Sequence, residues 1–236
     1  YEIIKCDWSA DVCSSDLANY LTRHPILLDE LLDPRILEQK PDWPALEQRL
    51  RAELAEYAND TEERMDLLRI FQHTQTFRLA VQDIAGLWTV EAISDQLSLL
   101  ADLMLELVME QAWNELTSRH RDQPHFAAIG YGKLGGKELG YASDLDVVFL
   151  YDDDHPDAGE IYARFARRIV NWITSATPAG TLYDLDLRLR PNGAAGLLVS
   201  SIEAFEQYQR ESAWIWEHQA LTRARYCAGD TDIGRK

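Results

Sequence analysis

Hydrophobic residues in the first half of the chain recur three or four positions apart, the period of helices that bury one side. The pattern is clearest over residues 43–57, 60–84 and 91–116, and a leucine cluster precedes these stretches. We therefore predict an all-helical segment over residues 18–120. Packing of a helical bundle explains these stripes better than a partner-binding role, and no candidate chemistry lies among them.

The pattern changes after residue 120, where a polar stretch separates the helices from runs of strand-forming residues. We expect strands at residues 126–131, 145–151 and 181–190, with a short one at 197–199. A helix is predicted over residues 161–175. A second helical run is predicted from a capping box at Ser200 and Glu203 to about Tyr226. These elements indicate an α+β domain over residues 121–236.

The first 17 residues differ from the rest of the chain. Residues 7–17 read DWSADVCSSDL, which resembles the translation of a common sequencing adapter and has no apolar periodicity. We treat residues 1–17 as foreign sequence and exclude them from the fold argument.

Charge and composition limit the class of protein. The chain has 23 Lys and Arg against 40 Asp and Glu, a net charge of −17, so non-specific binding to nucleic acid is not expected. A stretch of about 20 apolar residues, which a membrane span needs, is not found, nor is a signal peptide. Three cysteines without metal-binding spacing fit a reducing compartment. We expect a cytoplasmic enzyme with no membrane partner.

Candidate chemistry begins with Asp144 and Asp146. Residues two apart on a strand point to the same side, so both carboxylates would face one place while the intervening apolar residues pack opposite. Two adjacent carboxylates favour a cation between them, and hard oxygen ligands suit Mg²⁺. Alone, such a pair is weak evidence, because many are surface residues.

A glycine pair, Gly135 and Gly136, precedes the two acids and follows a predicted strand. Paired glycines let the backbone approach a phosphate, and the Ser143 hydroxyl would add a donor. A plain tight turn would have the same sequence.

Strict alternation of apolar and charged residues marks positions 183–190. The apolar side would carry a tyrosine and three leucines, and the charged side would carry Asp184, Asp186, Arg188 and Arg190. A third carboxylate beside cations that bind phosphate would complete a two-metal site for phosphoryl transfer. A surface strand with one wet side is the simpler alternative.

These motifs stand in a longer resemblance. GYGKLGGKELGYASDLD at residues 130–146, DLRLRP at 186–191 and WEHQALTRAR at 216–225 resemble the glutamine synthetase adenylyltransferase family. The resemblance implies a nucleotidyltransferase fold like that of DNA polymerase beta, a mixed sheet with flanking helices. It also implies that the family pattern continues beyond residue 236, so that the domain is truncated and a second catalytic half is missing.

For the site, the resemblance implies that Asp144, Asp146 and Asp186 bind Mg²⁺, and that Asp186 helps to deprotonate a tyrosine hydroxyl. Asp184 is a weaker alternative. ATP is the expected substrate. Its phosphates would contact the backbone or side chains of Gly135, Gly136 and Ser143, and also Lys133, Arg188 and Arg190, although these cations could instead pair with nearby acids.

For the activity, the resemblance implies transfer of AMP to a tyrosine of glutamine synthetase. Residues 130–133, 140–144 and 192–196 are more similar to the attaching, C-terminal half of the family than to the AMP-removing half. A PII-type signalling protein is a further expected partner. Two alternatives stay open: AMP removal by phosphorolysis, and a regulatory module that binds nucleotide without turnover.

Overall fold

The computed structural model describes residues 39–236, so the predictions for residues 1–17 and for the start of the helical segment lie outside the described residues. The predicted helices are confirmed as α4 (Trp43–Glu56), α5 (Thr61–Ile84) and α6 (Val90–Asn114). The N-cap residues are Asp42, Asp60 and Thr89, respectively. The side chain of each accepts a hydrogen bond from the backbone N–H three residues later. Among the described helices, none is long and apolar enough to cross a membrane.

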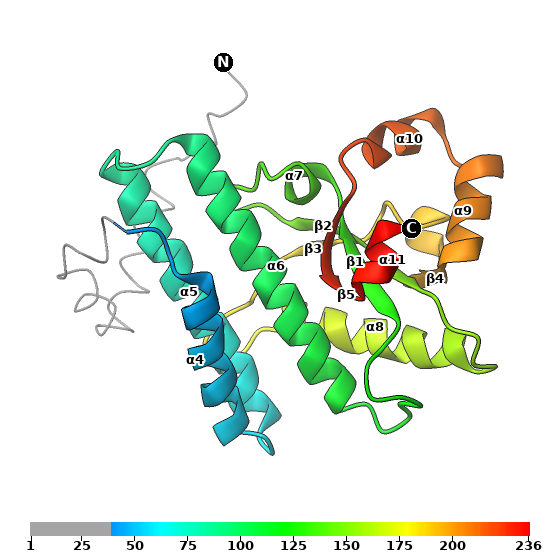
Figure 1. The fold of residues 1–236 in the computed structure, drawn as a ribbon, viewed down its shortest axis with the longest axis horizontal. Coiled ribbons are helices and arrows are strands. Elements are labelled where there is room, and N and C mark those ends of the chain that lie inside the picture. The colour runs from blue at the N-terminus through cyan, green and yellow to red at the C-terminus, as the bar shows by residue number, and fades with distance from the viewer. Residues whose placement is uncertain (1–38) are drawn as a thin grey trace.

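A mixed sheet follows, in the order β3-β2-β1-β5, with β4 also paired to β2 (Figure 1). β1 pairs antiparallel with β2 and β5, whereas β3 and β4 both run parallel to β2. The bounds are β1 (Phe126–Gly130), α7 (Gly132–Gly135), β2 (Leu145–Tyr151), α8 (Ala158–Thr174), β3 (Leu185–Asp186), η1 (Gly193–Ala195), β4 (Val199–Ser201), α9 (Ile202–Glu211), α10 (Ile215–Leu221), β5 (Arg225–Gly229) and α11 (Thr231–Arg235). This is the α+β arrangement of mixed sheet and flanking helices that the sequence predicts.

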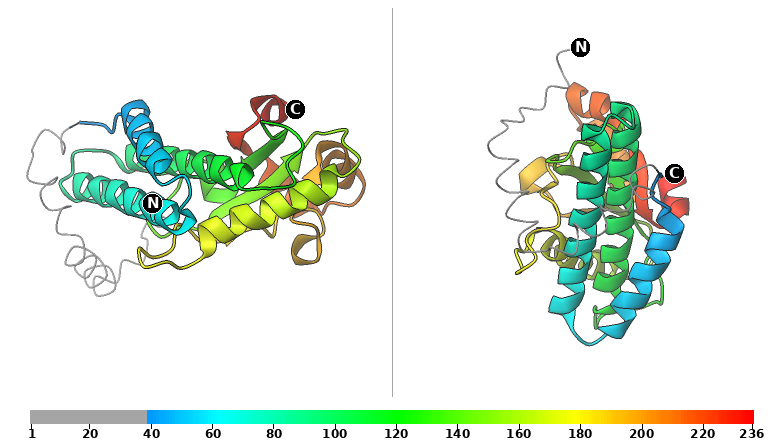
Figure 2. Two further views of the ribbon diagram at one scale, coloured as in Figure 1. Left: turned by 90° about the horizontal axis from the view of Figure 1, so that it is seen from below. Right: turned by 90° about the vertical axis from the view of Figure 1, so that its left-hand side faces the viewer.

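Strand β2 has both faces covered, because helices pack on each side of the sheet (Figures 1 and 2). Leu145, Val147 and Phe149 are buried in the main core with residues of α4, α5, α6 and α8. Val148 and Leu150 point the other way, into a smaller core with residues of α9, α10 and α11. Alternation along β2 therefore assigns Asp146 to the second face.

The helical segment and the sheet share the main hydrophobic core. Arg69 on α5 is fully buried and donates to the carbonyls of Gly180 (2.9 Å), Trp172 (2.8 Å) and Ser175 (2.6 Å), around the end of α8. The Trp172 and Ser175 carbonyls lie at the C-terminal end of α8, where helix carbonyls lack intrahelical partners, and the Gly180 carbonyl lies in the loop that follows. Helix α5 is thereby joined to the predicted nucleotidyltransferase domain.

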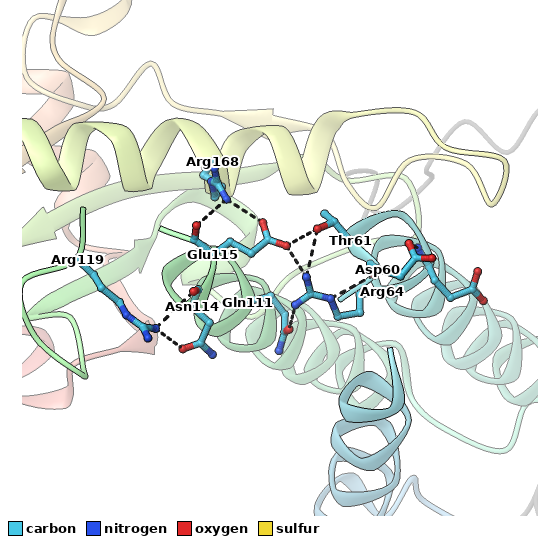
Figure 3. Close-up of polar contacts among 9 residues, drawn as sticks. Asp60, Thr61, Arg64, Gln111, Asn114, Glu115, Arg119 and Arg168 are labelled. Carbon is cyan, nitrogen blue, oxygen red and sulfur yellow. Dashed lines mark hydrogen bonds and ion pairs between the residues drawn. The ribbon is translucent and has the colours of Figure 1, made fainter. Parts of the chain in front are cut away.

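A second polar network joins α5, α6 and α8 (Figure 3). The Glu115 carboxylate, just after α6, pairs with Arg64 of α5 and with Arg168 of α8, where Nη1 lies 2.9 Å from Oε2. Arg64 also donates to Gln111 Oε1 at 2.7 Å, and the Thr61 hydroxyl donates to Glu115 Oε1 at 2.6 Å. Two arginines of opposite helices thus share one acid.

The predicted strand over residues 181–190 is wrong in its length. Only Leu185–Asp186 is a strand, because the chain turns at Leu187, where Arg190 N–H donates to the Leu187 carbonyl at 3.3 Å. Leu187 packs on the main core and Leu189 on the smaller core, so the apolar residues do not share one face.

The helix predicted from Ser200 to about Tyr226 is also wrong. Ser200 lies in β4, and the N-cap is Ser201, whose hydroxyl accepts from Ala204 N–H. The run divides into α9 and α10, and the chain then enters strand β5. A strand at this position depends on hydrogen bonds to β1, which periodicity within the segment does not reveal.

Candidate functional site

The site is built around two acids on neighbouring strands. Asp146 on β2 and Asp186 on β3 are direct partners in the parallel register. Paired residues of parallel strands point to the same side of a sheet, and the strands lie about 4.8 Å apart. The two carboxylates therefore project together from the face that carries α9, α10 and α11.

Asp144 stands exposed at the entrance to β2 and completes the acidic group. The pKa of Asp146 is raised, first by burial and then by the negative charges of Asp144 and Asp186. Arg188 and Lys133 act in the opposite direction and lower it. Three carboxylates and two cations thus interact electrostatically around Asp146.

Asp186 is held by the turn that ends β3. One of its oxygens accepts the backbone N–H of Arg188 at 2.8 Å, which is an Asx turn. The Arg188 guanidinium also binds the carboxylate, with Nε 2.8 Å from Oδ2 and 3.0 Å from Oδ1. These bonds lower the pKa of Asp186, so in this arrangement its carboxylate is a weak proton acceptor.

Gly132 is a site residue that sequence reasoning missed. Its φ is +51°, and a Cβ at this position would lie 2.2 Å from Asp146 Oδ2. Only glycine leaves room for the Asp146 carboxylate against the backbone where α7 begins. The available signal in the sequence was a glycine directly after the end of a predicted strand.

The two predicted phosphate-binding glycines differ in their surroundings. A Cβ at Gly135 would lie 1.9 Å from the Arg223 carbonyl oxygen, so this glycine allows close packing against the segment before β5. Gly136 is exposed and has more room, with its nearest neighbour, the Gly132 carbonyl oxygen, 3.3 Å from a built Cβ. The pair lies in and just after helix α7, rather than in a plain loop. Contact with phosphate stays a prediction for both.

The other predicted phosphate contacts lie in the loops beside the acids. Lys133 is exposed on α7, and Ser143 accepts the Gly140 N–H at 3.0 Å, which shapes the loop before Asp144. Arg190 donates to the carbonyls of Leu187 (2.7 Å) and Gly196 (3.3 Å) and so closes the loop after β3. Contact of Arg190 with phosphate stays a prediction, and the exposed side chain of Arg188 binds the Asp186 carboxylate.

The donor set fits a divalent cation in its chemistry. Two adjacent carboxylates, with Asp146 partly buried and repelled by its neighbours, supply hard oxygen ligands and an excess of negative charge. Within residues 39–236, no three Asp, Glu, His or Cys side chains are already arranged to hold one ion. The Arg188 guanidinium provides the positive charge beside Asp186 instead.

The sequence of this chain is similar to one family of known proteins. The family model described as glutamate-ammonia ligase adenylyltransferase matches residues 10–236. A bifunctional glutamine synthetase adenylyltransferase/adenylyl-removing enzyme of Chromobacterium violaceum is 64% identical over 221 residues, covering 94% of this chain and 25% of the relative. Proteins of the same name from Neisseria meningitidis serogroup B and Aromatoleum aromaticum are 61% and 63% identical, covering 93% and 92% of this chain.

The chain spans about a quarter of the length of these relatives, since it covers 25%, 25% and 23% of them. The match nevertheless includes nearly all of the chain and every residue of the acidic group. On this evidence the chain belongs to the glutamate-ammonia ligase adenylyltransferase family, whose members are nucleotidyltransferases.

Proposed function

We propose that this chain carries the adenylyl-attaching site of its family and transfers AMP from ATP to a tyrosine hydroxyl of glutamine synthetase. The observation that carries the proposal is the parallel register of Asp146 and Asp186, with Asp144 directly before β2. In this reaction the tyrosine oxygen forms a bond to the α-phosphorus of ATP. The bond between the α-phosphorus and the oxygen that bridges to the β-phosphate breaks, and pyrophosphate leaves.

Asp144, Asp146 and Asp186 would hold Mg²⁺. When bound, Mg²⁺ neutralises charge on the phosphates and stabilises the attacking and leaving oxygens. The exposed Arg188 and Lys133 side chains would bind phosphate oxygens that enter beside the acids. If the Arg188 guanidinium moved from Asp186 to phosphate, one Asp186 oxygen would be free to accept the tyrosine proton.

Direction of the reaction is part of the proposal. The resemblance of residues 130–133, 140–144 and 192–196 to the attaching half supports adenylylation rather than phosphorolysis. Incubation with α-labelled ATP, Mg²⁺ and unmodified glutamine synthetase should give labelled AMP-tyrosine. Release of ADP from adenylylated glutamine synthetase and phosphate, without the forward reaction, would identify the AMP-removing half instead.

The acids provide the sharpest test of catalysis. Asp144→Asn and Asp146→Asn keep side-chain size but remove the negative charge, so transfer should fall at least about 100-fold in each variant. Each should remain folded, because Asp144 is exposed and Asp146 loses a carboxylate that its neighbours repel. Transfer measured with labelled ATP, beside circular dichroism, checks both statements. Unchanged transfer with folded protein would contradict the site.

Location and partners follow from the same proposal. A cytoplasmic enzyme would meet glutamine synthetase and ATP directly, and a PII-type signalling protein would regulate the longer enzyme. The net charge of −17 supports a protein rather than a nucleic acid as the macromolecular substrate.

A further inference from the structure

Helix α5 ends with an acid in an unfavourable place. Asp83 lies in the last turn, where the partial negative charge of the helix C-terminus repels a carboxylate, and the turn contains no basic residue. Because the helix C-terminus disfavours the Asp83 carboxylate, a contact outside the helix must explain its position. The reason in this fold is a partner that is 58 residues away in the chain.

That partner is Tyr141, whose hydroxyl donates to Asp83 Oδ2 at 2.9 Å. The Tyr141 ring is half-buried and packs on the main core. Burial and the Asp83 carboxylate both raise the Tyr141 pKa, so the hydroxyl keeps its proton and remains a donor. The Tyr141 hydroxyl is therefore available as the donor of this bond at neutral pH.

Tyr141 lies inside the short loop that leads to the acids. The loop is closed by Ser143, which accepts the Gly140 N–H and donates its own N–H to the Gly140 carbonyl at 3.2 Å. Asp144 follows Ser143 directly, and Asp146 is two residues further. The Asp83 bond consequently holds the loop from the side of the helical segment, three residues before the first acid.

Helix α6 is linked to the other segment beside Asp146, helix α7, through Arg225 of β5. Asp102 binds the Arg225 guanidinium at 2.6 and 3.0 Å, and Arg225 also donates to the Leu134 carbonyl of α7 at 3.0 Å. Helix α7 contains Gly132, against which the Asp146 carboxylate lies. Helix α5 thus binds one segment beside Asp146 directly, and α6 is linked to the other through Arg225.

We propose that Asp83 and Tyr141 are positioning residues, which hold the loop before Asp144 in the arrangement that binds the divalent cation. The inference rests on the proposed function, because it assigns these residues to the geometry of the same site. The bond acts on Asp144 through three residues of a closed loop, so its loss allows this carboxylate to move relative to Asp146.

The test is titration of the full chain with Mn²⁺ alone, in which free Mn²⁺ is measured by electron paramagnetic resonance. Tyr141→Phe and Asp83→Ala should each weaken Mn²⁺ binding about threefold to tenfold. The effects in the double variant should be less than additive, because both substitutions remove the Asp83–Tyr141 bond. Asp83→Asn retains an acceptor oxygen and should bind almost as the wild type does. Tyr141→Phe should also raise the Mg²⁺ concentration that half-saturates AMP transfer, with the rate recovering at high Mg²⁺.

Tyr162→Phe is the matched control. Tyr162 also donates to an acid, Asp153 Oδ2 at 2.7 Å, but at the opposite end of β2. This variant should lower the melting temperature and leave Mn²⁺ affinity unchanged, which separates positioning from stability. If the wild type binds Mn²⁺ and neither Tyr141→Phe nor Asp83→Ala alters the affinity, the inference is overturned but the proposed function is not. A wild-type chain that binds no Mn²⁺ would overturn the metal site of the proposed function, and the inference with it.

Discussion

Position 132 requires glycine for two reasons, and both concern the Cβ atom that any other residue would add. The backbone there has φ of +51°, and a Cβ would lie 2.2 Å from Asp146 Oδ2. Gly132→Ala should therefore destabilise the fold by about 1–2 kcal/mol through backbone strain, and should also displace the Asp146 carboxylate. We expect nearly complete loss of AMP transfer, measured beside urea unfolding.

Gly86 offers a matched control for this substitution. Its φ is +66°, but a Cβ there would meet nothing within 4 Å. Gly86→Ala should cost a similar free energy of unfolding and leave transfer intact. Equal losses of transfer in the two alanine variants would mean that strain, rather than displacement of Asp146, causes the defect.

Asp153 gives the fold a defined response to acid. Its side chain is fully covered, and burial alone would raise its pKa, but bonds from His155 N–H, Tyr162 and His120, with the charge of Arg121, lower the pKa to about 2. The unfolded chain has the ordinary value of 3.8. The carboxylate therefore adds stability above pH 4, which is lost as pH falls toward 2, and its contribution is about 1–2 kcal/mol.

The measurement is the free energy of unfolding between pH 5 and pH 2 for the wild type and for Asp153→Asn. The difference between them should shrink as the pH falls through this range. A difference that stays constant would show that Asp153 does not titrate between the two states.

At the scale of elements, Glu115 binds arginines of two different helices (Figure 3). The Arg64 side chain is only 7% exposed, so removal of the negative charge leaves a buried cation without its acid. Glu115→Gln should lower the free energy of unfolding by about 2–3 kcal/mol. Guanidinium unfolding followed by circular dichroism measures the change.

An exposed pair provides the comparison for that variant. Arg49 and Glu53 on α4 lie 2.9 Å apart, but their side chains are 73% and 39% exposed. Glu53→Gln should change stability by less than about 0.5 kcal/mol, because water and salt screen such a pair. A loss at Glu115 as small as the loss at Glu53 would show that the network in Figure 3 does not stabilise the helix packing.

At the scale of the whole molecule, the helical segment and the sheet should unfold together. They share the main core, and Arg69 binds three carbonyls near the end of α8 from within α5. Scanning calorimetry should therefore show one transition whose calorimetric and van't Hoff enthalpies agree. Two separate transitions would instead support independent domains that divide near residue 120.

The site also depends on this shared core. Asp83 of α5 binds Tyr141 in the loop before Asp144, and Asp102 of α6 binds Arg225, which donates to α7. The sequence pattern of these helices indicates only a packed bundle. A polar residue on an amphipathic helix can face water or a distant loop. The spacing of polar and apolar residues along the helix is the same in both cases, so the sequence does not distinguish them. The partner is decided by how the helices pack on the sheet.

Local sequence patterns predict the long helices, strands β1 and β2, and the pair Asp144 and Asp146, because periodicity and capping act within a few residues. Tertiary structure alone decided that β3 is two residues long and that residues 225–229 form a strand on the edge of β1. It also decided that Asp186 lies in register with Asp146 and that the Asp146 carboxylate packs against the backbone of Gly132. Hydrogen bonds between strands and contacts across loops join residues far apart in the chain, so no local pattern specifies them.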